Sequence, residues 1–148
     1  MMMAEDSTIL LAEDNSDDIE LIKRMFEKNR IGNKLIVIQE GEEVLDYLFR
    51  QGSYEGRQYS RPSLILLSLN LPKLGGVEIL EKISENRKTS AIPVLVLIAH
   101  ETEKILVDES GLDIEGYIQK PLTLEKLEKA VEKLEFSLLR DTGSKEGP

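Results

Sequence analysis

Several polar side chains stand where apolar segments of the sequence end. Glu13 and Asp14 follow one such segment, Ser68 and Asn70 close a second, and Lys120 follows a third. Two carboxylates near an ammonium group could hold a hard cation and a phosphate group, because Mg²⁺ takes oxygen ligands. Alone, the acidic pair is more often a solvated turn and helix cap, and a single lysine is most often a surface residue. Their joint occurrence favours a site.

The apolar segments alternate with segments of helical periodicity. We expect strands at 7–12, 35–39, 64–68, 93–99 and 116–119. We expect helices at about 16–29, at 42–51, after Gly75 and Gly76, at 102–110, and from the Thr123 cap through Leu138. Near-continuous apolar strands indicate a parallel sheet covered on both faces. The predicted fold class is therefore a (βα)5 doubly wound α/β fold with a five-stranded parallel sheet. Ligand chemistry in such folds lies at the carboxyl ends of the strands.

Composition excludes several classes of function. The chain of 148 residues is expected to form one domain over 7–139, with a tail at 1–6 and a disordered tail at 140–148. A net charge of -9 argues against binding to nucleic acid. The absence of cysteine and the single histidine, His100, exclude thiol chemistry and histidine-cluster metal sites. No apolar run reaches the ~18 residues of a membrane span, and no signal peptide is visible, so we expect no membrane partner and a cytoplasmic location.

Three rival chemistries lack their motifs. A nucleotide site would need a glycine-rich turn after the first strand, but that turn reads AEDNSDD. FMN binding would also need a phosphate loop, which is absent. A serine hydrolase would need G-x-S-x-G around its nucleophile, whereas Ser68 lies in LLSLN.

Three stretches of this sequence resemble the receiver domain of two-component response regulators. They are ILLAEDNSDDIELIKRMFEKN, PSLILLSLNLPKLGG and YIQKPL, and the resemblance covers about residues 7–139. The loop at 52–62, with YLFRQGSY before it, is similar to single-domain regulators that partner phytochrome-type histidine kinases. The resemblance implies a flavodoxin-like receiver fold, a role in phosphorelay signal transduction, and a histidine kinase or another receiver as partner.

The resemblance also implies a role for each position of the site. In typical members, a kinase phosphorylates an aspartate at the end of the third strand, where this chain has Ser68. Carried onto this sequence, the Mg²⁺ positions are Glu13, Asp14 and the backbone of Asn70; the phosphoryl-contact positions are Ile98, Ala99 and Lys120; and the switch aromatic is Tyr117.

Two of these positions depart from the family pattern. Ser68 has no carboxylate and cannot form an aspartyl phosphate. Ile98 replaces a threonine or serine, donates no hydrogen bond, and is expected to fill the place of a phosphoryl oxygen. Ser63 and Gly75 also stand where aspartate is common. An engineered change at Ser68 would not explain Ile98, so the two departures together favour natural divergence.

The leading interpretation is a degenerate receiver, or pseudo-receiver, that acts as a protein-interaction module and not as an enzyme. With one carboxylate missing, we expect Mg²⁺ to bind weakly or not at all, and Ser68→Asp to lower stability without metal. One alternative is a regulator triggered by Ser68 phosphorylation or by non-covalent phosphate. Another is a small metal-assisted phosphate enzyme that uses Glu13, Asp14 and Lys120.

Late apolar residues predict a possible homodimer. Leu138 and Leu139 stand far enough along the last helix to extend past the sheet. Tyr117, on the fifth strand, lies on the face that receivers use for pairing, so Tyr117, Leu138 and Leu139 form the expected dimer face. Most of the leucine stripe of this helix is expected to cover the sheet instead.

Overall fold

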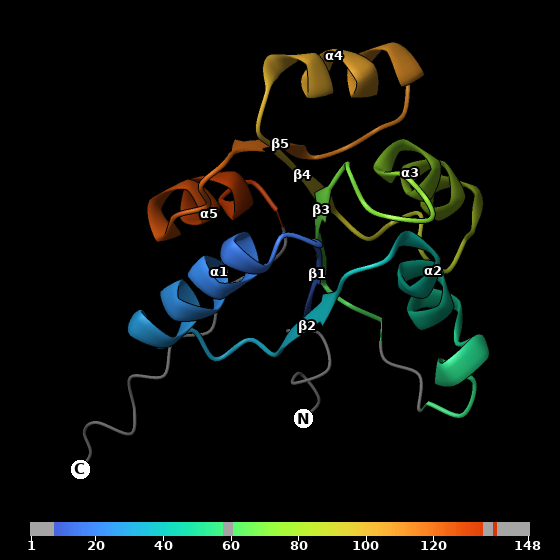
Figure 1. Ribbon diagram of the computed structural model, residues 1–148, viewed down its shortest axis with the longest axis horizontal. Coiled ribbons are helices and arrows are strands. Elements are labelled where there is room, and N and C mark those ends of the chain that lie inside the picture. The colour runs from blue at the N-terminus through green and yellow to red at the C-terminus, as the bar shows by residue number, and fades with distance from the viewer. Residues whose placement is uncertain (1–7, 58–60, 135–137, 139–148) are drawn as a thin grey trace.

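The strands form one parallel sheet at the centre of the molecule (Figure 1). The computed structural model describes residues 8–57, 61–134 and 138, and five strands lie within them. The strands are β1 (Ile9–Ala12), β2 (Leu35–Ile38), β3 (Leu64–Ser68), β4 (Val94–Ile98) and β5 (Gly116–Gln119), in the order β2-β1-β3-β4-β5. All four pairings are parallel. This order is that of flavodoxin-like doubly wound folds, so the predicted fold class is confirmed.

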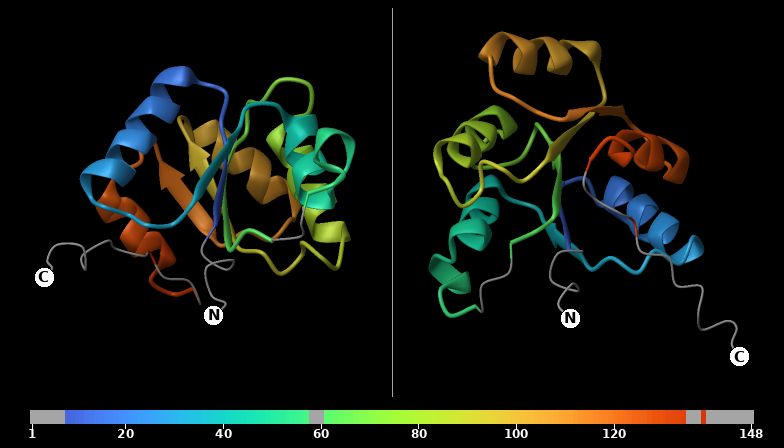
Figure 2. Two further views of the ribbon diagram at one scale, coloured as in Figure 1. Left: turned by 90° about the horizontal axis from the view of Figure 1, so that it is seen from below. Right: turned by 180° about the vertical axis from the view of Figure 1, so that it is seen from behind.

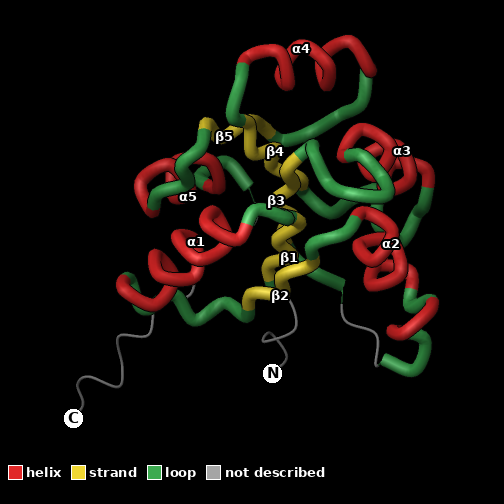
Figure 3. Tube along the Cα trace, in the orientation of Figure 1, coloured by secondary structure: helices red, strands yellow, loops and turns green. Residues whose placement is uncertain are grey.

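Helices cover both faces of the sheet (Figures 2 and 3). They are α1 (Ser16–Lys28), α2 (Gly41–Phe49), the short 3₁₀ helix η2 (Gly52–Tyr54), α3 (Gly76–Glu85), α4 (Glu101–Ser110) and α5 (Leu124–Val131). Helices α1 and α5 lie on one face, and α2 and α3 on the other (Figure 1). In the described ranges, no helix is long and apolar enough to cross a membrane.

Each face of the sheet has its own apolar core, because side chains alternate along every strand. Leu64 and Leu66 of β3 pack with Ile22 and Phe26 of α1. Residues of the opposite parity, such as Leu67, pack toward α2, α3 and α4. All five residues of β3 are buried, as a central strand covered on both faces requires.

Short-range signals set where the helices begin. Asn15 caps α1 by accepting a hydrogen bond from the Asp18 amide at 2.9 Å, and Thr123 caps α5 through the Lys126 amide at 3.2 Å. Gly76 starts α3 directly against the end of β3: a Cβ there would lie 2.7 Å from the Leu69 Cα. Only glycine therefore allows α3 to approach the end of β3 this closely.

Two predicted segments differ from the structure. The 52–62 loop contains η2, which is held by the Tyr54 hydroxyl donating to Glu43 at 2.6 Å. Helix α5 ends at Val131 and not at Leu138, because the Leu134 amide bonds to the Val131 carbonyl at 3.0 Å in a tighter, 3₁₀-type turn. The expected tails, 1–6 and 140–148, lie outside the described residues.

Candidate functional site

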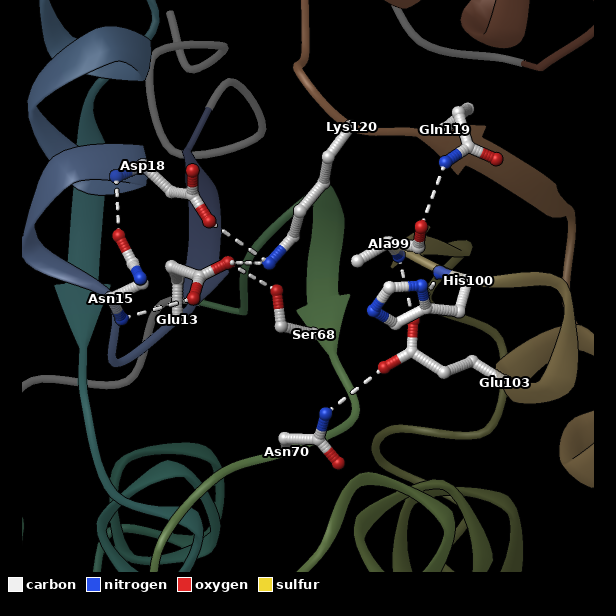
Figure 4. Close-up of polar contacts among 10 residues, drawn as sticks. All are labelled: Glu13, Asn15, Asp18, Ser68, Asn70, Ala99, His100, Glu103, Gln119 and Lys120. Atoms are coloured by element: carbon white, nitrogen blue, oxygen red, sulfur yellow. Dashed lines mark hydrogen bonds and ion pairs between the residues drawn. The ribbon is translucent and has the colours of Figure 1, made fainter.

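The side chains of Glu13, Ser68 and Lys120 meet at the carboxyl edge of the sheet (Figure 4). Strands β1 and β3 are direct neighbours, with Ala12 paired to Leu67, so Glu13 stands beside Ser68. Alternation along the strands places Glu13, Ser68 and Lys120 on the face that α1 and α5 cover. Strand β2 lies on one side of β1 and strand β3 on the other, so the strand order reverses at this point. Open α/β folds bind their ligands at the carboxyl edge beside such a point.

Glu13 is the centre of this cluster. Its side chain is 1% exposed, and its Oε1 lies 2.8 Å from the Nζ atom of Lys120. The Ser68 hydroxyl donates a hydrogen bond to the same Oε1. The other oxygen, Oε2, accepts a hydrogen bond from the Asn15 amide at 3.0 Å. A buried carboxylate is costly unless it is paired, and these three donors meet that requirement.

Lys120 has a second carboxylate partner, Asp18 in the first turn of α1. Its Nζ atom lies 3.1 Å from the Asp18 Oδ2. Burial acts to lower the pKa of the Lys120 ammonium, but the hydrogen bonds and charges of Glu13 and then Asp18 outweigh it, so the pKa is raised. Lys120 is therefore a fixed cation between two carboxylates.

The predicted acidic pair is divided by the fold. Glu13 is buried in the cluster, whereas Asp14 lies exposed and takes no part in the polar contacts of the described residues. Asp18 occupies the position beside Lys120 that Asp14 was expected to share. Asp18 is not among the site residues predicted from the sequence; its place in the first turn of α1, shortly after the end of β1, is the signal that could have found it.

A second cluster, around Glu103, joins the loops after β3 and β4. Glu103 Oε1 accepts from the Ala99 amide at 2.6 Å and from the His100 amide at 3.2 Å. Glu103 Oε2 accepts from the Asn70 side-chain amide at 3.0 Å. Glu103 was not predicted from the sequence; a glutamate three residues after the N-cap residue, here His100, is the capping-box signal that could have found it.

Ile98 and Tyr117 lie on the other face of the sheet. Ile98 is 3% exposed and belongs to the core cluster under α2, α3 and α4. The Tyr117 hydroxyl donates to Asp108 at 2.6 Å and to the Lys104 carbonyl at 3.2 Å, so α4 holds the ring. Burial and the hydrogen bond to Asp108 raise the pKa of Tyr117 to about 12. The two substituted positions, Ser68 and Ile98, thus belong to opposite faces.

Of the three expected dimer residues, Tyr117 and Leu138 lie in the described part of the chain, and both are half-buried. Leu138 is partly buried and packs against the core under α1 and α5. Its role in a dimer face stays a prediction. Its neighbour Leu139 lies outside the described residues. Tyr117 is half-buried beneath α4.

The comparisons with known proteins identify the family. The sequence model of one protein family, the response regulator receiver domain, matches residues 9–132. The chain belongs to the response regulator receiver domain family. It is 36% identical over 127 residues to response regulator Rcp1 of Synechocystis sp., covering 86% of this chain and 85% of that protein.

Solved receiver structures share the fold. The bacteriophytochrome response regulator RtBRR aligns with a TM-score of 0.81 at 32% identity, covering 89% of this chain and 80% of that one. The Mn²⁺-bound form of Rcp1 aligns with a TM-score of 0.69 at 34% identity, covering 89% and 98%. The predicted resemblance to receivers of the phytochrome type is confirmed.

The residues of this receiver fit a divalent cation poorly. Within residues 8–57, 61–134 and 138, no three His, Cys, Asp or Glu side chains are grouped so that they could hold a metal ion. Glu13 is already paired with Lys120, and Ser68 offers a hydroxyl in place of a carboxylate. Asp14 and the backbone of Asn70 remain as the predicted ligands, which is a weak set for a hard cation.

Proposed function

We propose that this receiver is a phosphorylation-independent interaction module of a two-component system. The observation that carries the proposal is the contact between Ser68 and Glu13. The residue at the acceptor position has no carboxylate, is 3% exposed, and donates its hydroxyl hydrogen to a buried glutamate. An acyl phosphate cannot form on a hydroxyl side chain, so signalling through an aspartyl phosphate is not available at this position.

Charge balance supports the same proposal. Lys120, the cation expected to bind phosphoryl oxygens, already lies against Glu13 at 2.8 Å and Asp18 at 3.1 Å. An incoming phosphoryl group would have to compete with both carboxylates for the same ammonium. The site is therefore satisfied within the chain and does not require an added anion.

Phosphorylation of Ser68 itself is the less favoured alternative. A kinase would have to reach a hydroxyl that is 3% exposed. A serine phosphate carries about −1.5 to −2 charges and would stand against Glu13. Non-covalent phosphate would have to compete for Lys120 with Glu13 at 2.8 Å and Asp18 at 3.1 Å.

A metal-assisted phosphate enzyme is also disfavoured. That function would require Glu13, Asp14 and Lys120 to hold a cation and a phosphate together. Glu13 is tied to Lys120, and Asp14 is exposed. Receivers are signalling proteins, and we propose that this one acts by binding and performs no catalysis.

The proposed partner is a histidine kinase or another receiver, met in the cytoplasm. A homodimer through β5 and α5 is a second possibility, because a groove of about 310 Å³ lies there. Its lining is Tyr117, Ile118, Gln119, Lys126, Lys129 and Ala130. Sedimentation that shows a monomer at all concentrations would rule out the homodimer and leave the kinase or receiver partner.

One incubation separates the three functions. The chain is mixed with Mg²⁺ and acetyl phosphate, and both its intact mass and the release of inorganic phosphate are followed. No adduct and no release above the protein-free rate support the interaction module. A stable adduct on Ser68 supports the phosphoserine alternative, and phosphate release by turnover supports the enzyme.

A further inference from the structure

Glu103 connects two loops that leave neighbouring strands. Asn70 follows β3, whereas Ala99 and His100 follow β4, and the Glu103 carboxylate contacts all three (Figure 4). Its Oε1 accepts from both backbone amides and its Oε2 from the Asn70 side chain. A single side chain on α4 therefore joins the ends of β3 and β4 on the functional edge of the sheet.

The carboxylate is nearly withdrawn from solvent. Glu103 is 9% exposed, and a glutamate is rarely buried to this degree unless it is paired. Hydrogen bonds from N–H groups to an ionised carboxylate are about twice as strong as neutral ones. The three donors compensate for the burial of this charge.

Helix capping alone does not account for these contacts. A capping box needs only the hydrogen bond that the backbone amide of the N-cap residue, here His100, donates to Glu103. The bonds from Ala99 and Asn70 are additional, and the one from Ala99, at 2.6 Å, is the shortest of the three. The Ala99 carbonyl in turn accepts from the Gln119 side chain at 3.1 Å, which extends the connection to β5.

We propose that Glu103 is a positioning residue, an internal latch that fixes the loops after β3 and β4 in one arrangement. Backbone amides at the start of a helix favour an anion, and Glu103 supplies one from within the chain. The inference rests on the proposed function and deepens it, because the latch explains how this edge keeps one shape without a phosphoryl group.

The test is amide hydrogen exchange and two-dimensional NMR on the full chain with Glu103→Ala, Glu103→Gln and Glu101→Ala. Glu101 is an exposed acid in the same first turn, so its removal controls for the helix dipole. We expect exchange at the Ala99 amide to be at least ~10-fold faster in Glu103→Ala than in Glu101→Ala. The side-chain amide resonances of Asn70 move in the same variant, and Glu103→Gln retains part of the protection at Ala99.

Two results would overturn the latch. One is an equal response of Ala99 and Asn70 to Glu103→Ala and Glu101→Ala. The other is a change confined to His100, which would leave Glu103 as an ordinary helix cap. Amides of Leu66 and Val96, in the middle of β3 and β4, report any global loss of stability. If Glu103→Ala does not fold, Glu103→Gln against Glu101→Gln gives the same comparison.

The proposed function fails by a different measurement. A phosphoryl adduct on the wild-type chain would refute the interaction module whatever the exchange at Ala99. If Glu103→Ala changes neither Ala99 nor Asn70 more than Glu101→Ala does, and the wild-type chain forms no adduct, the latch is refuted and the interaction module stands.

Discussion

The Nζ atom of Lys120 lies 2.8 Å from Oε1 of Glu13, and the Glu13 side chain is only 1% exposed. A cation on the loop after β5 thus neutralises a buried carboxylate at the end of β1, although β3 and β4 lie between these two strands in the sheet. The Ser68 hydroxyl, between them, donates to the same oxygen. In this receiver the functional edge of the sheet is held together by its own charges.

Replacing Lys120 with methionine should destabilise the fold. Glu13 would keep only the Ser68 and Asn15 donors, and breaking a buried pair costs about 3–5 kcal/mol. Lys120 is 22% exposed, so we expect a smaller loss, roughly 1–3 kcal/mol, in urea unfolding. Lys73→Met is the matched control: its pair with Glu40 is exposed, with 3.6 Å between Nζ and Oε1, and should change stability by less than about 0.5 kcal/mol. Equal losses in the two variants would contradict a buried pair.

The contribution of Lys120 to the free energy of unfolding should depend on pH only in the alkaline range. The folded state raises the pKa of Lys120 above 10.5, so the contribution is complete below that value and is lost as pH rises through the raised pKa. The stability difference between wild type and Lys120→Met should therefore be constant from pH 7 to about 10 and shrink above it. A difference that already falls between pH 7 and 9 would contradict this assignment.

Ser68→Asp should lower stability when no metal is present. The new carboxylate would stand against Glu13 in a site that is 3% exposed. Two like charges at ~4 Å repel by about 1 kcal/mol in water and about 4 at an effective dielectric of ~20. The neutral variant Ser68→Asn, of similar size, isolates the charge, and thermal unfolding in chelator compares the two. A higher melting temperature for Ser68→Asp than for Ser68→Asn would refute the charge argument.

Mg²⁺ should bind the wild-type chain weakly and the Ser68→Asp variant more tightly. A third carboxylate completes an oxygen ligand set of the kind that hard cations require. Calorimetric titration in the millimolar range should show no saturation for the wild type and saturation for Ser68→Asp. Clear saturation of the wild type would count against the degenerate site.

Asp108→Asn should lower the pKa of Tyr117 from about 12 toward its ordinary value of 10.0, because one of the causes of the raised pKa, the charged hydrogen-bond partner, is lost. At pH 11 the tyrosine Cζ chemical shift should then report a larger ionised fraction than the roughly one tenth expected for the wild type. Tyr54, whose pKa is also raised to about 12 by its hydrogen bond to Glu43, is the internal control. An unchanged Tyr117 would mean that Asp108 contributes little.

The strands and the centre of the site could be predicted from the sequence. Buried parallel strands are apolar throughout, and the ends of parallel strands meet at one edge of the sheet. Residues at the ends of these strands or directly after them, such as Glu13, Ser68 and Lys120, are therefore brought to this edge by the fold alone, although they are far apart in sequence.

The contacts made by helix side chains could not be predicted in the same way. Whether Asp14 or Asp18 reaches Lys120 depends on the path of the chain between β1 and α1. Glu103 points toward the sheet because of how α4 is rotated about its own axis. The spacing of residues around Glu103 does not indicate Asn70, which lies far away in sequence, as its partner. The end of α5 at Val131 has no glycine or proline to mark it.

The most direct test is the intact mass of the wild-type chain after incubation with Mg²⁺ and acetyl phosphate, with Ser68→Asp alongside. We predict that the wild-type mass is unchanged, because Ser68 has no carboxylate and its hydroxyl is bound to Glu13. Ser68→Asp, which restores the acceptor group, should gain one labile phosphoryl group. A phosphoryl group on the wild-type chain would contradict the account.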